Sequence, residues 1–137
     1  ARGVMQIMPS TARSFGLDGN RIVNNRENIA VAAKIISHLD RQFASLVPNA
    51  EERKKFILAA YNSGPAHVLD AIALARKLGY DDKVWFGSVE NALMLKSKPE
   101  YYNDPVCKYG YFNGRQTYQY VHSVLATYDQ ARKKVPI

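Results

Sequence analysis

The sequence predicts an all-α fold, because helix start and stop signals divide most of the chain into helical segments. Residues 25–45 carry apolar side chains at intervals of three to four positions, as a helix with one buried face does. Helices over residues 50–61 and 65–77 follow, because Asn49 and Pro65 are residue types that begin helices and Gly79 is a type that ends them. Residues 116–134 form the final predicted helix.

Length and composition indicate one folded domain that covers residues 1–137. A chain of 137 residues is long enough to bury a core, and a hydrophobic content of 47% with nine tyrosines is typical of a globular protein. The sequence contains no apolar run of about 18 residues, so we expect no membrane-spanning helix in it. The chain opens at Ala1 in the middle of a motif, which is typical of a fragment.

The individual helices carry predictions of their own. Residues 8–15 predict a short helix that Gly16 ends. Asn24 and Glu27 together resemble a capping box at the start of the next helix, and we favour this capping role for Glu27 over that of a catalytic acid. Residues 81–95 indicate one or two short helices, and residues 96–114 a segment that is mostly loop. The expected buried positions are Ile29, Ala32, Ala33, Ile36, Leu39 and Phe43 in the 25–45 helix, and Val68, Leu69, Ile72 and Leu78 in the 65–77 helix.

Residues 56–68, FILAAYNSGPAHV, combine an apolar run with a polar corner. The run 56–60 suits a buried helix segment, after which Tyr61 and Asn62 emerge and Gly64 with Pro65 breaks and restarts the helix. One interpretation is a corner that presents a phenol and a carboxamide to a ligand. The other is a helix end that Asn62 caps. His67, which follows, is expected to be a surface or hydrogen-bonded residue.

Three motifs in order resemble those of the lytic transglycosylases, which are peptidoglycan-cleaving enzymes with a lysozyme-like fold. Residues 3–12, GVMQIMPSTA, resemble the family's Gly-Leu-Met-Gln motif, with Val4 in place of leucine. Residues 59–65 match its Ala-Ala-Tyr-Asn-x-Gly-Pro motif, and residues 118–121 resemble its aromatic motif with a Tyr-Val pair. Gln116 stands where many family members have glutamate. The resemblance implies an all-α, lysozyme-like domain with a glycan-binding groove.

The resemblance also implies the substrate-binding residues. Gln6 would hydrogen-bond the glycan near the cleavage point, and Met5 would pack beside it. Tyr61 and Asn62 would contact the sugar and hold it in register with the catalytic acid, and Tyr120 would touch that acid. The family requires neither a metal nor an organic cofactor, so we expect none here.

The family's single catalytic glutamate lies shortly before the first motif, which places it upstream of Ala1. None of the acids present occupies its position, so the resemblance implies no catalytic residue within this chain and no activity without the missing glutamate. The implied reaction cleaves the β-1,4 bond between N-acetylmuramic acid and N-acetylglucosamine without water and leaves a 1,6-anhydro end. Two alternatives stay open, namely a binding module of the same fold that does not cut and a lysozyme that hydrolyses.

The charge balance favours a polyanionic partner. Lys and Arg number 19 against 12 Asp and Glu, for a net charge of +7. Peptidoglycan glycan strands are the partner that the motifs favour, whereas nucleic acid lacks a recognised motif and a basic surface without a partner stays open. Residues 108–114 resemble a membrane-bound branch of the family, which implies a periplasmic monomer held at the outer membrane by segments outside this chain. The single Cys107 is interpreted as structural.

Overall fold

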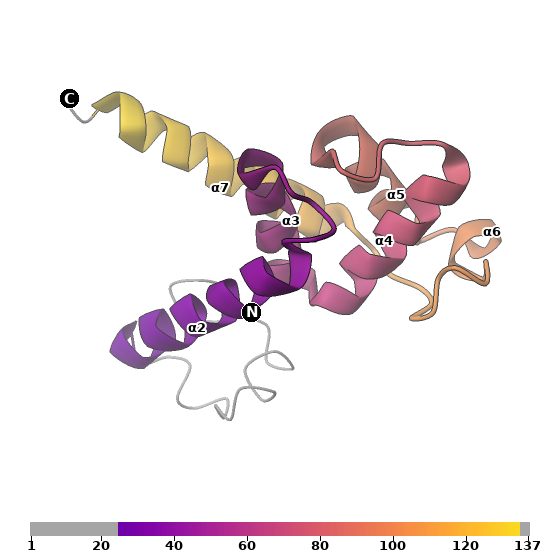
Figure 1. The fold of residues 1–137 in the computed structure, drawn as a ribbon, viewed down its shortest axis with the longest axis horizontal. Coiled ribbons are helices and arrows are strands. Elements are labelled where there is room, and N and C mark those ends of the chain that lie inside the picture. The colour runs from indigo at the N-terminus through magenta and orange to yellow at the C-terminus, as the bar shows by residue number, and fades with distance from the viewer. Residues whose placement is uncertain (1–24, 135–137) are drawn as a thin grey trace.

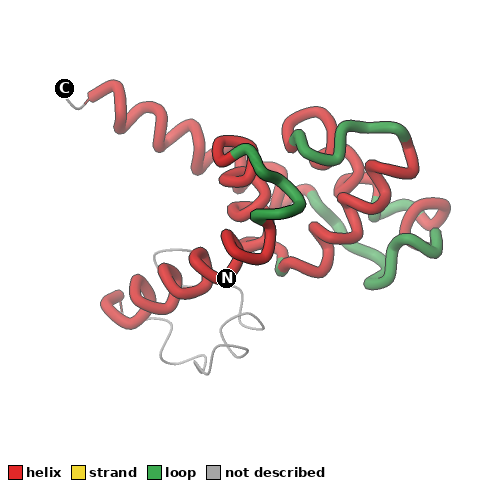
Figure 2. Tube along the Cα trace, in the orientation of Figure 1, coloured by secondary structure: helices red, strands yellow, loops and turns green. Residues whose placement is uncertain are grey.

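The computed structural model describes residues 25–134, and within them the side chains of residues 29–130. Every regular element in this part of the chain is helical (Figure 2), which confirms the all-α prediction. The elements are α2 (Asn25–Phe43), α3 (Ala50–Ser63), α4 (Pro65–Leu78), the kinked turn η2 (Trp85–Val89), α5 (Glu90–Leu95), α6 (Pro99–Tyr102) and α7 (Arg115–Lys134). The helix expected over residues 8–15 and the capping pair of Asn24 and Glu27 lie outside the described side chains.

Helix α3 is the central element of the described fold (Figure 1). It contacts α2, α4, α7 and η2, while α5 packs against α4 and η2. The C-terminal half of α7 extends away from the other helices. The core includes a row of aromatic rings in which the Phe56 ring lies 6.4 Å from Phe43 and 5.2 Å from Trp85, between ring centroids. These rings hold α2, α3 and η2 together. Helix α7 packs on α3, which belongs to this group.

The buried face of α2 differs in part from the predicted one. Ala32, Leu39 and Phe43 are buried as expected, but Ile29 is 57% exposed and Ala33 is also exposed. Ile35, which the prediction omitted, is 1% exposed. The spacing alone allows either of two neighbouring stripes, and the packing of α3 selects the stripe that contains Ile35.

The boundaries of α3 and α4 follow their local signals. Asn49 caps α3 by accepting a hydrogen bond from the Glu52 backbone N–H at 3.0 Å. Gly64 ends α3 with φ +90°, a conformation that favours glycine, and Pro65 begins α4. Gly79 ends α4 in the left-handed conformation, as predicted. Asn62 lies inside α3, so the interpretation of Asn62 as a helix cap is wrong.

The burial pattern of α4 also needs one correction. Val68 and Ile72 are buried and Leu69 is partly buried, but Leu78 is 36% exposed. Leu78 is the last residue of the helix, directly before the turn at Gly79. An unexpected charged residue, Asp70, is buried in the middle of the same face at 3% exposure.

Two glutamates hold the turn η2 in place. Glu52 on α3 accepts a hydrogen bond from the Trp85 backbone N–H at 3.0 Å, and Glu90 accepts one from the Gly87 N–H at 3.2 Å. Each carboxylate also pairs with a side chain, Glu52 with Lys55 at 2.6 Å and Glu90 with His122 at 2.7 Å. These two carboxylates therefore have a structural role, which is to hold the turn.

Candidate functional site

The second motif lies at the end of α3, and the prediction that Tyr61 and Asn62 emerge from the core there is wrong, because both are buried. Phe56, Ala59 and Ala60 are buried, and small side chains there allow α4 and α7 to approach. The helix ends with backbone bonding, since the Gly64 N–H donates to the Ala60 carbonyl at 2.8 Å. Tyr61 and Asn62 are therefore held on a rigid helical turn.

Tyr61 is buried, with an exposed fraction of 1%. Within the described part of the chain, its hydroxyl finds no hydrogen-bond partner. Burial raises the pKa of this phenol well above its usual range, and the nearby phenol of Tyr120 raises it further. Tyr61 is consequently neutral at physiological pH, with a hydroxyl able to donate one hydrogen bond.

Asn62 connects the second motif to α7. Its side-chain Oδ1 accepts a hydrogen bond of 2.8 Å from the hydroxyl of Thr117, which is in the first turn of α7. Both side chains are buried, at 4% and 0% exposure. The bond joins residues 55 positions apart and sets the distance between the two helices at this point.

Tyr120 follows Thr117 on α7 and is half-buried. Burial raises its pKa, so it too is neutral at physiological pH. The packing of α3 on α7 and the bond from Thr117 to Asn62 bring Tyr120 into the neighbourhood of Tyr61, whose pKa it helps to raise. The structure thus brings together three predicted site residues from two motifs, Tyr61, Asn62 and Tyr120. Met5 and Gln6 lie outside the described residues, and the sugar contacts predicted for all five residues stay predictions.

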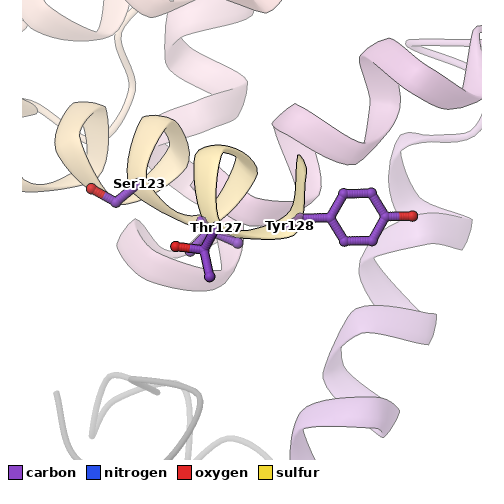
Figure 3. A pocket seen from close by; sticks show the side chains of 4 residues that line it. Ser123, Thr127 and Tyr128 are labelled. Atoms are coloured by element: carbon purple, nitrogen blue, oxygen red, sulfur yellow. The ribbon is translucent and has the colours of Figure 1, made fainter. Parts of the chain in front are cut away.

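Two hollows are lined mainly by residues of α7, in and around the third motif. One, of about 330 Å³, is lined by polar side chains: Asn113, Arg115, Gln116 and Gln119. The other, of about 400 Å³, is mostly apolar and is lined by Ser123, Val124, Thr127 and Tyr128. Figure 3 shows the side chains of Ser123, Thr127 and Tyr128, which project from α7 in different directions. The amides and the guanidinium of the first hollow suit sugar hydroxyls, N-acetyl groups and carboxylates.

Sequence reasoning missed a buried ionic cluster between α4 and α5. The Lys96 ammonium is fully buried and donates to Asp70 Oδ2 at 2.7 Å. It also lies 2.7 Å from Nδ1 of His67, whose pKa is lowered by burial and then by the Lys96 charge, against the opposing effect of Asp70. His67 is hydrogen-bonded, as expected, but no sequence signal marks Lys96 as buried, because lysine at a helix end is normally exposed.

Cys107 lies beside this cluster and is 8% exposed. Burial and then the Asp70 charge raise the pKa of its thiol, which makes it a poor nucleophile. Its place in the core agrees with a structural role. Within residues 25–134, no three His, Cys, Asp or Glu side chains are grouped as metal ligands would be. No helix in the same part has the length and apolar character needed to cross a membrane.

Comparison with known proteins places these motifs in a family. The chain is 36% identical over 123 residues to the membrane-bound lytic murein transglycosylase F of Sodalis glossinidius, which covers 90% of this chain and 25% of that protein. It is 33% identical to the protein of the same name from Shewanella loihica, over 93% of this chain and 26% of that protein. It is 31% identical to the protein of the same name from Desulfosudis oleivorans, over 97% of this chain and 28% of that protein.

The chain thus spans about a quarter of the length of the curated relatives that it matches. Residues 1–84, which include the first and second motifs, match the family model of the transglycosylase SLT domain. This match covers more than half of the 137 residues, and it agrees with the all-α architecture and with the order of the motifs. The chain therefore belongs to the transglycosylase SLT domain family.

Proposed function

We propose that residues 1–137 form one domain, the catalytic domain of a peptidoglycan lytic transglycosylase. The single observation that carries the proposal is the hydrogen bond from Thr117 to Asn62, since it joins the second motif to the helix of the third and brings Tyr61 near Tyr120. Membership in the transglycosylase SLT domain family supports this activity, and so does the name of the relatives, lytic murein transglycosylase.

The reaction proposed needs one acid and no water. A glutamic acid donates its proton to O4 of N-acetylglucosamine as the bond from C1 of N-acetylmuramic acid to that oxygen breaks. The resulting carboxylate then takes the proton from the 6-hydroxyl of the same muramic acid, whose oxygen bonds to C1. The products are a 1,6-anhydro-muramic end and a free 4-hydroxyl.

The acid is assigned to no carboxylate with a described side chain. Glu52 and Glu90 bind the turn η2, and Asp70 is buried against Lys96. In the proposal, Tyr61 and Tyr120 surround a glutamate that lies outside this chain. Burial of that glutamate among the aromatic rings and apolar neighbours would raise its pKa and keep it protonated for its first step.

The partner proposed is the glycan strand of peptidoglycan, bound by a monomer. The net charge of +7 is complementary to the carboxylates that peptidoglycan carries. The name of these relatives also includes the words membrane-bound, which supports a periplasmic, membrane-associated location for the natural protein. We place that location at the outer membrane, as the resemblance of residues 108–114 implies.

A murein digest tests the proposed activity. Purified murein is incubated with the 137-residue chain and, in parallel, with the full-length protein that its gene encodes, and the soluble products are read by mass spectrometry. Anhydro-muropeptides from the full-length protein alone would support the proposal, including the assignment of the acid outside this chain. Reducing-end products would indicate a lysozyme instead. Murein binding without products from either protein would indicate a binding module.

A further inference from the structure

The loop between α6 and α7 exposes two tyrosines although its backbone is firmly held. Tyr109 and Tyr111 are each 57% exposed and flank Gly110, whose φ of +71° makes the turn between them. They are the two most exposed tyrosines among the described side chains. Neither tyrosine belongs to the three motifs of the family.

The buried ionic cluster fixes the path of this loop. Asp70 accepts hydrogen bonds from the backbone N–H groups of Lys108 at 3.0 Å and Tyr109 at 2.9 Å, in addition to that from Lys96. Both oxygens of one buried carboxylate are therefore occupied by the loop and its counter-ion. Because leaving such a buried carboxylate without these partners is costly, the cluster holds the loop backbone at Lys108 and Tyr109 in place.

Further contacts hold both ends of the same loop. The Phe112 N–H donates to the Lys96 carbonyl at 3.2 Å, and its ring stacks on His67 with centroids 4.3 Å apart. At the other end, Lys77 on α4 forms an ion pair with Asp104. Among the outward side chains, the Tyr111 ring meets that of Tyr102 edge to face, with centroids 5.7 Å apart. The tyrosines are thus preorganised, which lowers the entropy cost of binding a ligand.

We propose that Tyr109 and Tyr111 form a saccharide-binding platform that contacts the N-acetylated glycan strand outside the Tyr61, Asn62 and Tyr120 cluster. Aromatic faces pack on the apolar C–H faces of sugar rings, while the phenol hydroxyls reach the sugar hydroxyls. Lys108, next to Tyr109 in the chain, and Arg115, four residues after Tyr111, are both exposed, and their charges complement the carboxylates of peptidoglycan. The choice of a murein ligand rests on the proposed function.

Binding measurements on the 137-residue chain test the platform. The probe is chitohexaose, a neutral oligosaccharide of N-acetylglucosamine, and affinity is measured by calorimetry. We expect Tyr109→Ala and Tyr111→Ala each to weaken binding about 3- to 10-fold, because each removes one stacking face. Tyr109→Phe and Tyr111→Phe keep the ring and should retain most of the affinity. Tyr80→Ala, at a tyrosine 39% exposed outside the loop, is the matched control and should bind as the unmodified chain does.

A second probe tests the charge of Lys108. Lys108→Ala should weaken the binding of soluble murein fragments that carry carboxylates and leave chitohexaose binding unchanged. Equal binding of chitohexaose by the unmodified chain and the Tyr109→Ala/Tyr111→Ala double variant, with unchanged circular dichroism, would overturn the platform. So would phenylalanine variants as weak as the alanine ones, since stacking would then not be the interaction.

The platform and the proposed activity can fail separately. If the full-length protein makes anhydro-muropeptides while the double variant still binds chitohexaose normally, the platform is wrong and the activity stands. If the full-length protein makes none but the double variant loses binding, the activity is wrong and the platform belongs to a glycan-binding module.

Discussion

The hydroxyl of Thr117 donates a hydrogen bond of 2.8 Å to the carboxamide oxygen of Asn62, in the interior of the described fold. One residue lies near the end of α3 and the other in the first turn of α7. Because Asn62 follows Tyr61 directly and Thr117 lies about one helical turn before Tyr120, this bond helps to decide how the phenols of Tyr61 and Tyr120 approach each other. It is therefore the first interaction to perturb.

Thr117→Val is expected to destabilise the chain by about 1–3 kcal/mol in free energy of unfolding. Valine has nearly the same shape as threonine, so the change removes the donor and leaves the buried oxygen of Asn62 without it. Urea denaturation of the 137-residue chain measures the effect. Thr127→Val, at an exposed position on the same helix, should change stability by less than about 0.5 kcal/mol. Equal losses in the two variants would contradict a special role for this bond.

Tyr120→Phe should slow the formation of anhydro-muropeptides by the full-length protein about 10- to 100-fold. We expect the Tyr120 hydroxyl to hydrogen-bond the carboxylate that the catalytic glutamate becomes after it gives up its proton, and the loss of such a bond to a charged group corresponds to that range of rates. Initial rates of murein solubilisation provide the measurement. Tyr118→Phe, two positions earlier and 38% exposed, is the matched variant and should keep the full rate. A Tyr120→Phe enzyme as fast as the unmodified one would remove Tyr120 from the site.

Tyr61 should make the fold less stable at alkaline pH. Its pKa is raised in the folded state from an ordinary value of 10.0, chiefly by burial. Below about pH 10 the phenol is protonated in both states; above it only the unfolded chain releases the proton, so rising pH favours unfolding. This one group can contribute at most about 1.4 kcal/mol per pH unit.

The measurement for Tyr61 is the free energy of unfolding of the chain between pH 8 and pH 11, compared with that of Tyr61→Phe. Other groups, such as lysines, also titrate in this range, so the difference between the two curves isolates Tyr61. We expect that difference to be constant up to about pH 9.5 and then to grow in favour of the variant. A difference that stays constant to pH 11 would show that the folded phenol titrates normally.

Lys96→Met should be among the most destabilising single substitutions, with a loss of about 3–5 kcal/mol. The variant leaves the Asp70 carboxylate buried without its counter-ion, and the ammonium that faces His67 is lost as well. Thermal denaturation at pH 7 would show the effect. Lys98→Met, two residues on and exposed, should change stability by less than about 0.5 kcal/mol. A mild effect of Lys96→Met would mean that Asp70 becomes protonated or reaches solvent at little cost.

Local signals made the helix boundaries predictable. Asn49 begins α3 because its side chain accepts a backbone N–H that the first turn leaves unpaired, and Gly79 ends α4 because it adopts the left-handed conformation without strain. The residues that make up the three motifs could also be identified in advance, because residue type and order along the chain can be read from the sequence. Met5 and Gln6 lie outside the described residues, so the prediction for them stays as it was.

The incorrect predictions concern features that depend on distant partners. Ile29 was expected to be buried and Ile35 was omitted, because periodicity defines a stripe on α2 but not which side of that stripe α3 covers. The burial of Lys96 had no signal either, since it depends on Asp70 and His67, which are 26 and 29 positions away. The hydrogen bond between Asn62 and Thr117 could not be predicted for the same reason, since the two residues are 55 positions apart in the chain.

The sequence by itself therefore determined the family, the helices and the residues that carry the motifs, because these depend on residue type and on spacing along a few turns. Only the tertiary structure decided that Asn62 bonds to Thr117, that Tyr61 lies near Tyr120, and that Asp70 holds a loop bearing two exposed tyrosines. The physical reason is that these interactions join side chains from helices and loops far apart in the chain. Their pairing exists only once α3, α4, α5 and α7 have packed.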